Sequence, residues 1–298
     1  MFDICVIGHI TKDIIRIEKN KKELPGGVAY YFTLALRNLD PYLNICLITK
    51  LKNEDRILLD ELFKNNIQVF YTNSKETTIF ENIYTDTLNF RIQKVRAIAQ
   101  PFTIEDVSNK SAKIFHLGPL TNEDIPVEVI KYLSKKSKIS LDIQGFVRNV
   151  EQGEIKKINW KDKEEGLPCI EILKANEEEA KILTGINDIK KAAIKLAEYG
   201  IKEVVITLGR KGSLVFSNGK FFSFPAFPPK KTVDVTGCGD TYIAAYIYKR
   251  LKSCNIENAG NFAAATASLK IESFGPFKGN KEDVFYLLKT KNLLSYKE

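Results

Sequence analysis

Asp234–Asp240 reads D-V-T-G-C-G-D, and Thr241–Tyr246 follows it with a helical pattern. Gly237 and Gly239 bracket one small residue, so the backbone can turn tightly and approach a ligand without an intervening Cβ. Such a turn opens a helix whose N–H groups and dipole favour an anion. Asp240 adds a carboxylate there, which makes sense as a base for a hydroxyl that attacks a phosphate. The stretch predicts phosphoryl transfer to an alcohol; the alternative is an ordinary glycine turn with a surface aspartate.

Short apolar runs alternate with amphipathic helical patterns along the rest of the chain. Buried, β-branched strands followed by helices favour an α/β fold with a largely parallel central sheet and helices on both faces. Ligands in such sheets bind beyond the carboxyl ends of the strands, which suits the turn at Gly237. The expected strands are Asp3–Gly8, Asn44–Thr49, Gln68–Thr72, Lys113–Leu117, Lys138–Ile143, Glu171–Ala175 and Glu203–Leu208. The expected helices are Val28–Asn38, Asp55–Asn65, Val127–Lys135, Glu177–Leu183, Ile189–Tyr199, Asp240–Leu251, Ile256–Ile271 and Lys281–Leu288.

Two stretches show the alternation of antiparallel strands instead. Asp13–Ile17 alternates toward a turn at Lys19–Lys22, and Thr77–Tyr84 followed by Asn89–Val95 indicates a hairpin around Asp86. Short hairpins are marginal alone, so they need a face to cover or a partner chain. We expect a small β-sheet lid over the substrate that also pairs two subunits as a homodimer, or else an edge extension of the main sheet. The lid would comprise roughly residues 12–25 and 75–98.

Length and composition indicate a globular protein, and an α/β architecture of 298 residues still forms one domain over 1–298. No apolar run is long enough to span a bilayer. An acidic residue, Asp3, stands where a signal peptide needs a basic region. Five cysteines without a C-x-x-C pair fit reduced thiols. We therefore expect a cytoplasmic protein without a membrane partner.

The formal charge of +8 raises the question of a nucleic-acid partner. The lysines are spread along the chain and mixed with acids, as in Lys161–Glu165, and no zinc-finger or RNA-binding signature is present. We therefore expect no nucleic-acid partner. The sequence also lacks the P-loop, dinucleotide, zinc-protease and esterase motifs, which narrows the enzyme classes. The two histidines, His9 and His116, are interpreted as structural.

Four motifs follow one another in an order that resembles a known family: Gly26–Gly27, Asn176–Glu179, Thr207–Gly212 and Asp234–Asp240. PfkB/ribokinase-type carbohydrate kinases have this order, and the resemblance covers nearly the whole chain. The last motif is the most specific and the glycine pair the least. The resemblance implies a ribokinase-like fold and an ATP-dependent kinase that uses Mg²⁺ and acts on a small sugar or polyol.

The resemblance assigns the reacting groups to the D-V-T-G-C-G-D stretch. Asp240 resembles the catalytic base beside the attacking hydroxyl, where it also contacts the acceptor. The backbone N–H groups of Gly237, Cys238 and Gly239 would steady the charge that develops on the transferring phosphoryl. Cys238 stands where the family more usually has alanine; a reactive thiol is an alternative, but no nucleophile–base pair accompanies it.

Donor-binding residues are implied in the same way. Asn176 and Glu179 would work around Mg²⁺ and the phosphates, with Glu179 acting through water; a capping box is the alternative and is compatible with that role. The resemblance also implies a nucleotide-binding turn at Thr207, Gly209 and Gly212, for which the alternative is a tight hairpin into Ser213–Ser217. Thr236 and Asp234 would organise the loop. Asp234 would also bind a monovalent cation such as K⁺, as in some family members.

The acceptor side is implied by residues earlier in the chain. Asp13 stands where the family holds sugar hydroxyls, and a carboxylate accepts two such hydrogen bonds readily; a solvent-facing charge is the alternative. Gly26 and Gly27 would let the backbone pack close to the acceptor. Gln144 and Arg148 would line the pocket, although a strand end with a surface arginine is the alternative for Arg148.

A finer resemblance and one departure bear on the substrate. Gly26–Tyr31 and Asp142–Arg148 resemble the archaeal-type myo-inositol kinases. The family's usual asparagine after the glycine pair is missing, and Tyr30 or Tyr31 stands there, so ribose cannot be carried over as the acceptor. A tyrosine ring suits a cyclic polyol or a base-bearing substrate. The favoured function is therefore a kinase whose acceptor is myo-inositol or a sugar. The alternative functions are a nucleoside kinase and a non-catalytic protein that senses a nucleotide or sugar.

Overall fold

The computed structural model describes residues 1–17, 20–84 and 91–291. The chain forms two compact units, one of Met1–Tyr30 with Ile45–Glu171 and the other of Tyr31–Asn44 with Ile172–Glu298. The chain passes between them within helix α1 (Val28–Leu39). Within the described ranges, no helix is both long enough and apolar enough to cross a bilayer.

The first unit contains a parallel sheet with the strand order β9-β8-β1-β4-β5. Its central strand β1 is covered on both faces, since Ile4, Cys5, Val6 and Ile7 have no exposed surface. A parallel strand buried on both faces reads as a continuous apolar run, which explains why it was predictable. The strands are β1 (Phe2–Ile7), β4 (Ile45–Leu51), β5 (Gln68–Asn73), β8 (Ala112–Leu117) and β9 (Lys138–Asp142).

Helices connect these strands, and one of them differs from its expected form. The predicted helix Asp55–Asn65 is a 3₁₀ segment, Asn53–Leu59, followed by the short helix α2 (Asp60–Lys64). The expected helix Val127–Lys135 is confirmed as α4. The further helices of this unit are α3 (Ile104–Val107), α4 (Val127–Ser134) and α5 (Lys163–Gly166), with 3₁₀ turns at Gly145–Val147 and Leu167–Cys169.

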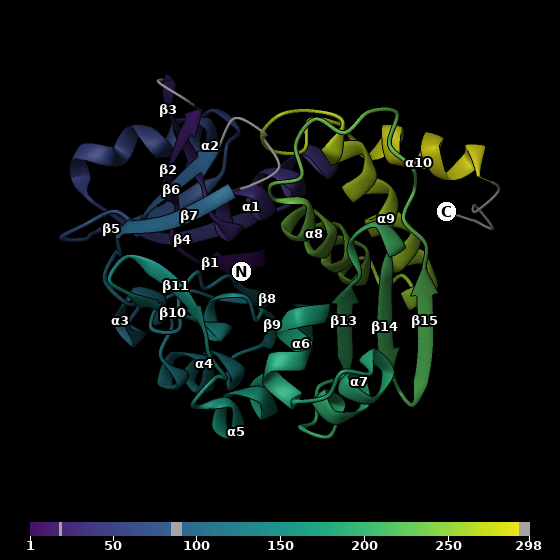
Figure 1. Cartoon of the computed structure of the whole chain (residues 1–298). Coiled ribbons are helices and arrows are strands. Elements are labelled where there is room, and N and C mark those ends of the chain that lie inside the picture. Colours follow the sequence, from purple (N-terminus) through teal and green to yellow (C-terminus); the bar gives the residue numbers. More distant parts are fainter. Residues whose placement is uncertain (18–19, 85–90, 292–298) are drawn as a thin grey trace. The chain divides into compact units, whose positions relative to one another are not determined.

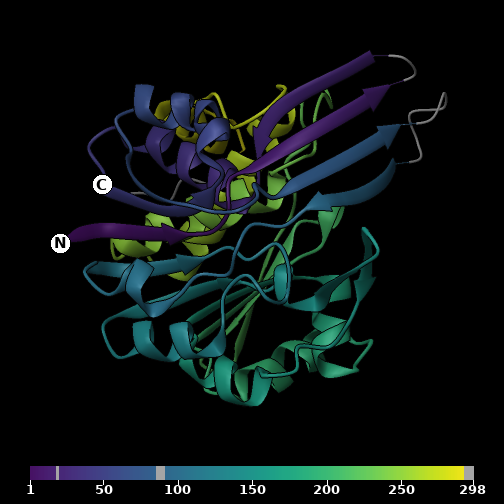
Figure 2. The same cartoon turned by 90° about the vertical axis from the view of Figure 1, so that its left-hand side faces the viewer.

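A second sheet of the first unit has the order β10-β11-β7-β6-β2-β3, and we call it the lid sheet. Figure 2 shows β2 and β3 in purple beside β6 and β7 in blue. The predicted small sheet is confirmed, while β10 and β11 were not expected because their charged, four-residue sequences carry no clear apolar alternation. Lys19 and the turn around Asp86, with Asn89, lie outside the described residues. The strands are β2 (Thr11–Ile17), β3 (Asn20–Gly26), β6 (Ile79–Tyr84), β7 (Arg91–Ala97), β10 (Arg148–Glu151) and β11 (Glu154–Lys157).

An apolar cluster holds one face of the lid sheet. Phe80 of β6 and Val95 of β7 pack with Val28 and Leu120, and all four side chains are at most 5% exposed. Burial of large apolar side chains stabilises such a contact by roughly 1.5–3 kcal/mol each. The lid sheet is therefore anchored at its base by the helix start and by the loop that follows β8.

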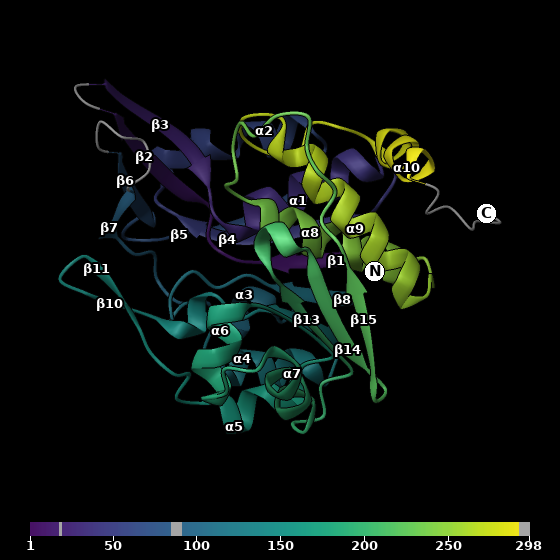
Figure 3. The same ribbon diagram turned by 45° about the vertical axis from the view of Figure 1, so that its right-hand side comes forward.

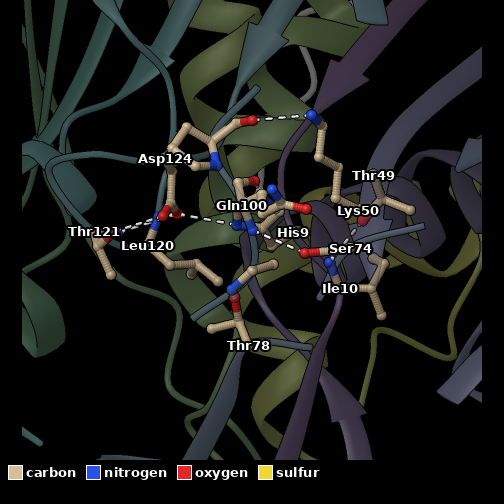
Figure 4. A network of polar contacts seen from close by, with 12 residues as sticks. His9, Ile10, Thr49, Lys50, Ser74, Thr78, Gln100, Leu120, Thr121 and Asp124 are labelled. Carbon is tan, nitrogen blue, oxygen red and sulfur yellow. Dashed lines mark hydrogen bonds and ion pairs between the residues drawn. The ribbon is translucent and has the colours of Figure 1, made fainter. Parts of the chain in front are cut away.

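A buried polar network fixes the loop after β8. Figure 4 shows His9 between Gln100 and Asp124, with its ring nitrogens 3.1 Å from the Gln100 carbonyl oxygen and 3.5 Å from the Asp124 carboxylate. The Asp124 carboxylate also accepts the Leu120 N–H at 2.7 Å. Burial raises the pKa of Asp124, but His9 and these hydrogen bonds outweigh it, so the pKa lies below its ordinary value. His9 thus serves to order the backbone around it.

The second unit has the strand order β15-β14-β13-β12, in which β12 and β13 are parallel and the rest antiparallel. Figure 3 shows helices α6 and α7 on one side of these strands and α8 and α9 on the other. Helices α8 and α9 lie side by side (Figure 1). The strands are β12 (Ile172–Asn176), β13 (Glu203–Thr207), β14 (Ser213–Ser217) and β15 (Lys220–Phe224); the helices are α6 (Glu177–Thr184), α7 (Ile189–Ala197), α8 (Cys238–Leu251), α9 (Ile256–Ile271) and α10 (Lys281–Thr290).

The alternation of strands and helices confirms the predicted α/β fold with its largely parallel pairing. The expected strands occur with bounds shifted by one or two residues, and β15 is an addition. Helix α8 is tied to β13 by Glu203, whose carboxylate accepts the Tyr246 hydroxyl at 2.5 Å and an Arg250 N–H at 2.6 Å. Because Glu203 is only 6% exposed, losing this carboxylate would leave two polar groups unpaired. This contact fixes the helix whose first turn carries Asp240.

Candidate active site

Gly237 begins helix α8 in a left-handed conformation, with φ 72° and ψ 9°. Its carbonyl oxygen accepts the Thr241 N–H at 2.9 Å, the first bond of the helix. A Cβ at this position would lie 2.2 Å from Cδ1 of the Tyr31 ring. The position therefore requires glycine for two reasons: its backbone is left-handed, and an aromatic ring packs against its Cα.

The N–H groups at this helix end differ in their partners. The Cys238 N–H donates to the Val235 carbonyl at 3.3 Å, a long bond that closes the turn. The N–H of the half-buried Gly239 has no hydrogen-bond acceptor within the described residues. Asp240 follows as a half-buried carboxylate in the first turn of α8. An anion at this helix start would meet unsatisfied N–H groups and the positive end of the dipole.

The Cys238 thiol is not set up to react. Burial raises its pKa to about 11, an effect that exceeds the lowering by Lys270. The sulfur lies 3.8 Å from the Ala267 carbonyl oxygen, against helix α9. Since the thiolate is the nucleophile, a thiol with this pKa is inert near neutral pH. Cys238 acts as a small side chain that lets the turn close.

Lys174 lies beside the candidate site, and the motifs did not reveal it. It lies in β12, is 5% exposed, and its ammonium comes so close to the turn that a Cβ on Gly239 would be 3.3 Å from Nζ. A buried cation beside a glycine turn is suited to a phosphate. The sequence signal was a lysine inside an otherwise apolar strand two residues before Asn176.

Asp234 organises the backbone that leads into the turn. Its carboxylate accepts the Thr236 N–H at 2.9 Å and the Gly275 N–H at 3.0 Å, and it lies 3.3 Å from Nζ of Lys270. Burial raises the pKa of Asp234, but these hydrogen bonds and Lys270 outweigh that effect and hold the pKa below its ordinary value. Asp234 and Thr236 are thus brought together, as the sequence predicted for a loop-organising pair.

Asn176 and Glu179 form the capping box that was considered as the alternative. The Asn176 side chain accepts the Glu179 N–H, and the Glu179 carboxylate accepts the Asn176 N–H, both at 2.8 Å. Glu179 is 5% exposed. Among the described residues, no group of three or more His, Cys, Asp or Glu side chains is placed to hold a metal. The Mg²⁺-related role of Asn176 and Glu179 stays a prediction.

The turn after β13 is a tight hairpin, as its glycines also allowed. Thr207 pairs with Ser213 across β13 and β14. Gly212 has φ 98°, and a Cβ there would lie 1.9 Å from the Phe224 carbonyl oxygen, so the chain itself requires this glycine. Gly209 also has a positive φ, of 58°, but faces open space, where a ligand can approach its backbone. The hairpin is compatible with the nucleotide-binding role, which stays a prediction.

Asp13 of β2 and Gly26 of β3 lie together in the lid sheet. The Thr11 hydroxyl donates to the Asp13 carboxylate at 2.6 Å, and a Cβ on Gly26 would lie 2.4 Å from that carboxylate. Gly27 has φ 91°, and a Cβ there would lie 2.6 Å from the His9 carbonyl oxygen. The glycine pair is thus explained by the fold: it makes room for the Asp13 carboxylate and for the backbone of the first loop.

Gln144 and Arg148 flank the 3₁₀ turn at Gly145–Val147 that follows β9. The Gln144 N–H donates to the Asp142 side chain at 3.1 Å, and both Gln144 and Arg148 are half-buried. Arg148 begins β10, so it is part of the lid sheet. The pocket-lining role of the two residues stays a prediction.

The two tyrosines after the glycine pair differ in their surroundings, and the suggested role of a tyrosine ring beside the acceptor stays a prediction. Tyr30 is 2% exposed and its hydroxyl donates to Glu61, so it belongs to the core. Tyr31 packs its ring on Gly237. A polar pair missed by sequence reasoning, Asn82 and Gln93, lies on the same face of the lid sheet as Asp13, with Nε2 of Gln93 3.0 Å from Oδ1 of Asn82. The alternation of side chains along β6 and β7 is the sequence signal from which this pair could have been found.

Comparison with known proteins places these features in a family. The profile of the pfkB family carbohydrate kinases matches residues 1–282. The chain belongs to this family. This confirms the resemblance to PfkB/ribokinase-type kinases on which the site residues were assigned.

Relatives of this pfkB-family chain include kinases for different acceptors. A cytidine kinase of Thermococcus kodakarensis is 29% identical over 259 residues, which cover 83% of this chain and 88% of the relative. A ribokinase of Arabidopsis thaliana is 37% identical over 131 residues, or 41% of this chain and 35% of the relative. The sequence relatives therefore support kinase chemistry without naming one acceptor.

Solved structures extend the comparison over nearly the full length. A pyrophosphate-dependent kinase in the ribokinase family, complexed with a pyrophosphate analog and myo-inositol, is 29% identical with a TM-score of 0.83, covering 95% of this chain and 99% of its own. A ribokinase from Thermotoga maritima has a TM-score of 0.77 at 22% identity, covering 97% of this chain and 100% of its own, and shows the fold alone. The ribokinase-like fold is thus confirmed, and the first structure agrees with the finer resemblance to myo-inositol kinases.

Replacing Gly237 tests the packing that supports the turn. Gly237→Ala should destabilise the protein more than Gly185→Ala, because Gly185 has nearly the same φ, 73°, but faces open space. The shared left-handed conformation costs about 1–2 kcal/mol, and only Gly237 adds a collision with Tyr31. Adding Tyr31→Ala should recover part of the loss. Urea denaturation of the two single variants, Tyr31→Ala and the double variant measures this; equal destabilisation by both glycine variants would contradict the prediction.

Proposed function

We propose that the chain is an ATP-dependent kinase that transfers the γ-phosphoryl group to a hydroxyl of a small sugar or cyclic polyol, with myo-inositol favoured. One observation carries the proposal: a left-handed glycine turn opens helix α8, and the carboxylate of Asp240 stands in its first turn. A carboxylate in the first turn is favourable with the helix dipole, but beside a phosphate site it adds repulsion, which a base for the attacking hydroxyl accounts for. The family membership supports this interpretation.

The mechanism assigns each group one task. Asp240 takes the proton from the acceptor hydroxyl as that oxygen attacks the phosphorus and the bond to the leaving diphosphate breaks. The N–H groups of Gly237 and Gly239 stabilise charge on the transferring phosphoryl, and the Cys238 N–H joins them by giving up its long bond to the Val235 carbonyl. Lys174, buried beside Gly239, neutralises the donor phosphates. Mg²⁺ bound with the donor adds charge neutralisation, and Glu179 would reach it through water.

Donor and acceptor residues divide between distant segments of the chain. Asn176, Thr207, Gly209, Gly212 and Thr236 would bind the nucleotide. On the acceptor side the proposed residues belong to the lid sheet or follow β9: Asp13, Gly26, Gly27, Gln144 and Arg148.

Polar side chains on the face of the lid sheet that also carries Phe80 and Val95 support a polyol acceptor. The Asp13 carboxylate accepts hydroxyl hydrogen bonds, while the Asn82–Gln93 pair offers amide donors and acceptors on the same face. Several hydroxyl groups on one ring match such a set of fixed polar groups. The myo-inositol complex of the pyrophosphate-dependent relative points to the same acceptor class.

Two alternatives keep distinct support. A nucleoside kinase is favoured by the similarity to the cytidine kinase over 83% of this chain. A non-catalytic nucleotide or sugar sensor would bind its ligands without turnover, but Asp240 gains nothing in such a protein, since a carboxylate weakens phosphate binding.

Asp240→Asn should lower the rate roughly 10²–10⁴-fold, because it removes the general base, with donor binding largely kept. Phosphoryl transfer is followed with Mg²⁺-ATP and a panel of inositols, aldoses, ketoses, sugar acids and nucleosides. Glu257→Gln, an exposed carboxylate in the first turn of α9, is the matched control and should keep full activity. A nucleoside as the best acceptor would replace the polyol assignment, and full activity of Asp240→Asn would overturn the mechanism.

Lys174→Met should raise the KM for the phosphoryl donor and lower kcat/KM roughly 10²-fold, the size of effect seen when one charge-stabilising group is lost. The KM for the acceptor should stay unchanged. ATP and pyrophosphate are compared as donors, because two similar structures are of a pyrophosphate-dependent kinase. If Lys174 binds only the phosphates, kcat/KM should fall by the same factor with ATP and with pyrophosphate. Unchanged KM values for both donors would show that Lys174 does not belong to the site.

The lid sheet is also proposed to pair two subunits of a cytoplasmic homodimer. Its outer strands β3 and β10 are edges that a second chain can extend or cover. Light scattering after size exclusion should give twice the mass of the chain. A monomeric mass at all concentrations that permit the assay would exclude the dimer.

A further inference from the structure

Lys270 is the most deeply buried cation near the glycine turn. It lies in the last turn of α9, and its side chain has no exposed surface. Its ammonium donates to the Asp234 main-chain oxygen at 2.8 Å and lies 3.3 Å from Oδ2 of the same residue. Burial lowers the pKa of Lys270, while the Asp234 carboxylate favours the charged form. Removing an ammonium from water is costly, so its retention here calls for a role.

Two chain segments surround the Lys270 ammonium, one before the glycine turn and one after α9. Val233 and Asp234 donate their N–H groups to the Ile271 carbonyl at 2.9 and 3.2 Å. The Gly275 N–H donates back to the Asp234 carboxylate at 3.0 Å. Residues before the glycine turn and residues after α9 are thus joined through Asp234, whose carboxylate and carbonyl both face the same positive charge.

A carboxylate oxygen and a main-chain carbonyl oxygen are the donors that a hard cation binds in proteins. An ammonium group and K⁺ carry the same charge and are similar in size, so the same oxygens suit either. Asp234 was expected to bind a monovalent cation, yet the ammonium already lies within contact of both its oxygen donors. The residues present therefore do not fit a free monovalent ion at these atoms.

We propose that the Lys270 ammonium takes the place of a monovalent cation, so that the chain orders its anion-binding turn without K⁺. The inference rests on the proposed function for the role of that turn. A cation attached to α9 cannot dissociate, so no ion has to be captured before the loop is ordered. Its charge also lies 5.7 Å from the centre of the Tyr31 ring, which packs on Gly237. Lys270 is a positioning residue that acts through Asp234.

Thermal unfolding and initial rates of the native protein are measured in choline, lithium, sodium, potassium and rubidium chlorides at one ionic strength. We expect the same Tm in all five salts and rates that agree within about twofold, because no site selects among them. A Tm or rate that rises specifically with K⁺ would overturn the proposal. The Tm series needs no substrate, so it decides the point even if no acceptor is phosphorylated.

Lys270→Ala should open a site in which a monovalent cation can bind the Asp234 oxygens in place of the ammonium. Its Tm and rate should fall in choline chloride and recover in potassium or ammonium chloride. Lys270→Met fills the same volume without charge and should fall without recovery in any salt. Lys252→Ala is the matched control, since it removes another Lys–Asp pair of the same unit, Lys252–Asp40 at 3.2 Å, and should show no salt-specific effect.

The outcomes separate a positioning role from a merely structural one. Recovery of Lys270→Ala by K⁺ or ammonium but not by choline supports the replacement, including the case in which this variant folds only with those ions. A Lys270→Ala variant that stays impaired in every salt, or one that matches the native protein in choline, contradicts it. If Tm recovers with K⁺ while no variant and no acceptor gives phosphoryl transfer, the cation inference stands and the proposed function falls.

Discussion

The left-handed backbone at Gly237 is the constraint on which the donor side of this protein depends. It turns the chain into helix α8, and the Tyr31 ring that packs against its Cα leaves no room for a side chain. Because the helix is fixed to β13 through Glu203, the turn cannot relax by moving the helix. The N–H groups of the turn are therefore held in place before any ligand binds, which is the condition for electrostatic stabilisation of a transferring phosphoryl group.

Charge around the turn is balanced by residues from three different elements. Lys174 of β12 and Lys270 of α9 bring positive charge, and Asp234 and Asp240 bring negative charge. Lys270 is paired with Asp234, and Lys174 is the buried cation beside Gly239. Asp240, half-buried in the first turn of α8, adds a second negative charge. Burial strengthens these pairings, because charges in a poorly hydrated site interact strongly with their immediate neighbours.

Much of the architecture could be predicted from sequence because it is local. Buried strands such as β1 are continuous apolar runs, helices such as α9 have their caps and periodicity in the chain, and the glycine turn with Asp240 is contiguous. The same reasoning failed where the pattern was short or ambiguous. β10 and β11 have four residues each, and the segment at Asn53–Leu59 adopts a 3₁₀ conformation that the helical periodicity did not distinguish. The capping box at Asn176 and Glu179 was foreseen as an alternative, since both residues lie within one helical turn.

Local sequence patterns are enough to predict the α/β class, the small second sheet, the family and the glycine turn before α8. The side chains that surround that turn become known only once the chain is folded. Tyr31, Lys174 and Lys270 are far from Gly237 in the chain, and their local patterns do not place them near the turn; the lysine within the apolar strand β12 marks Lys174 as unusual without showing which residues it contacts. Motifs and periodicities report contacts within a few residues, whereas packing, charge compensation and the room for a Cβ arise between segments that the fold brings together.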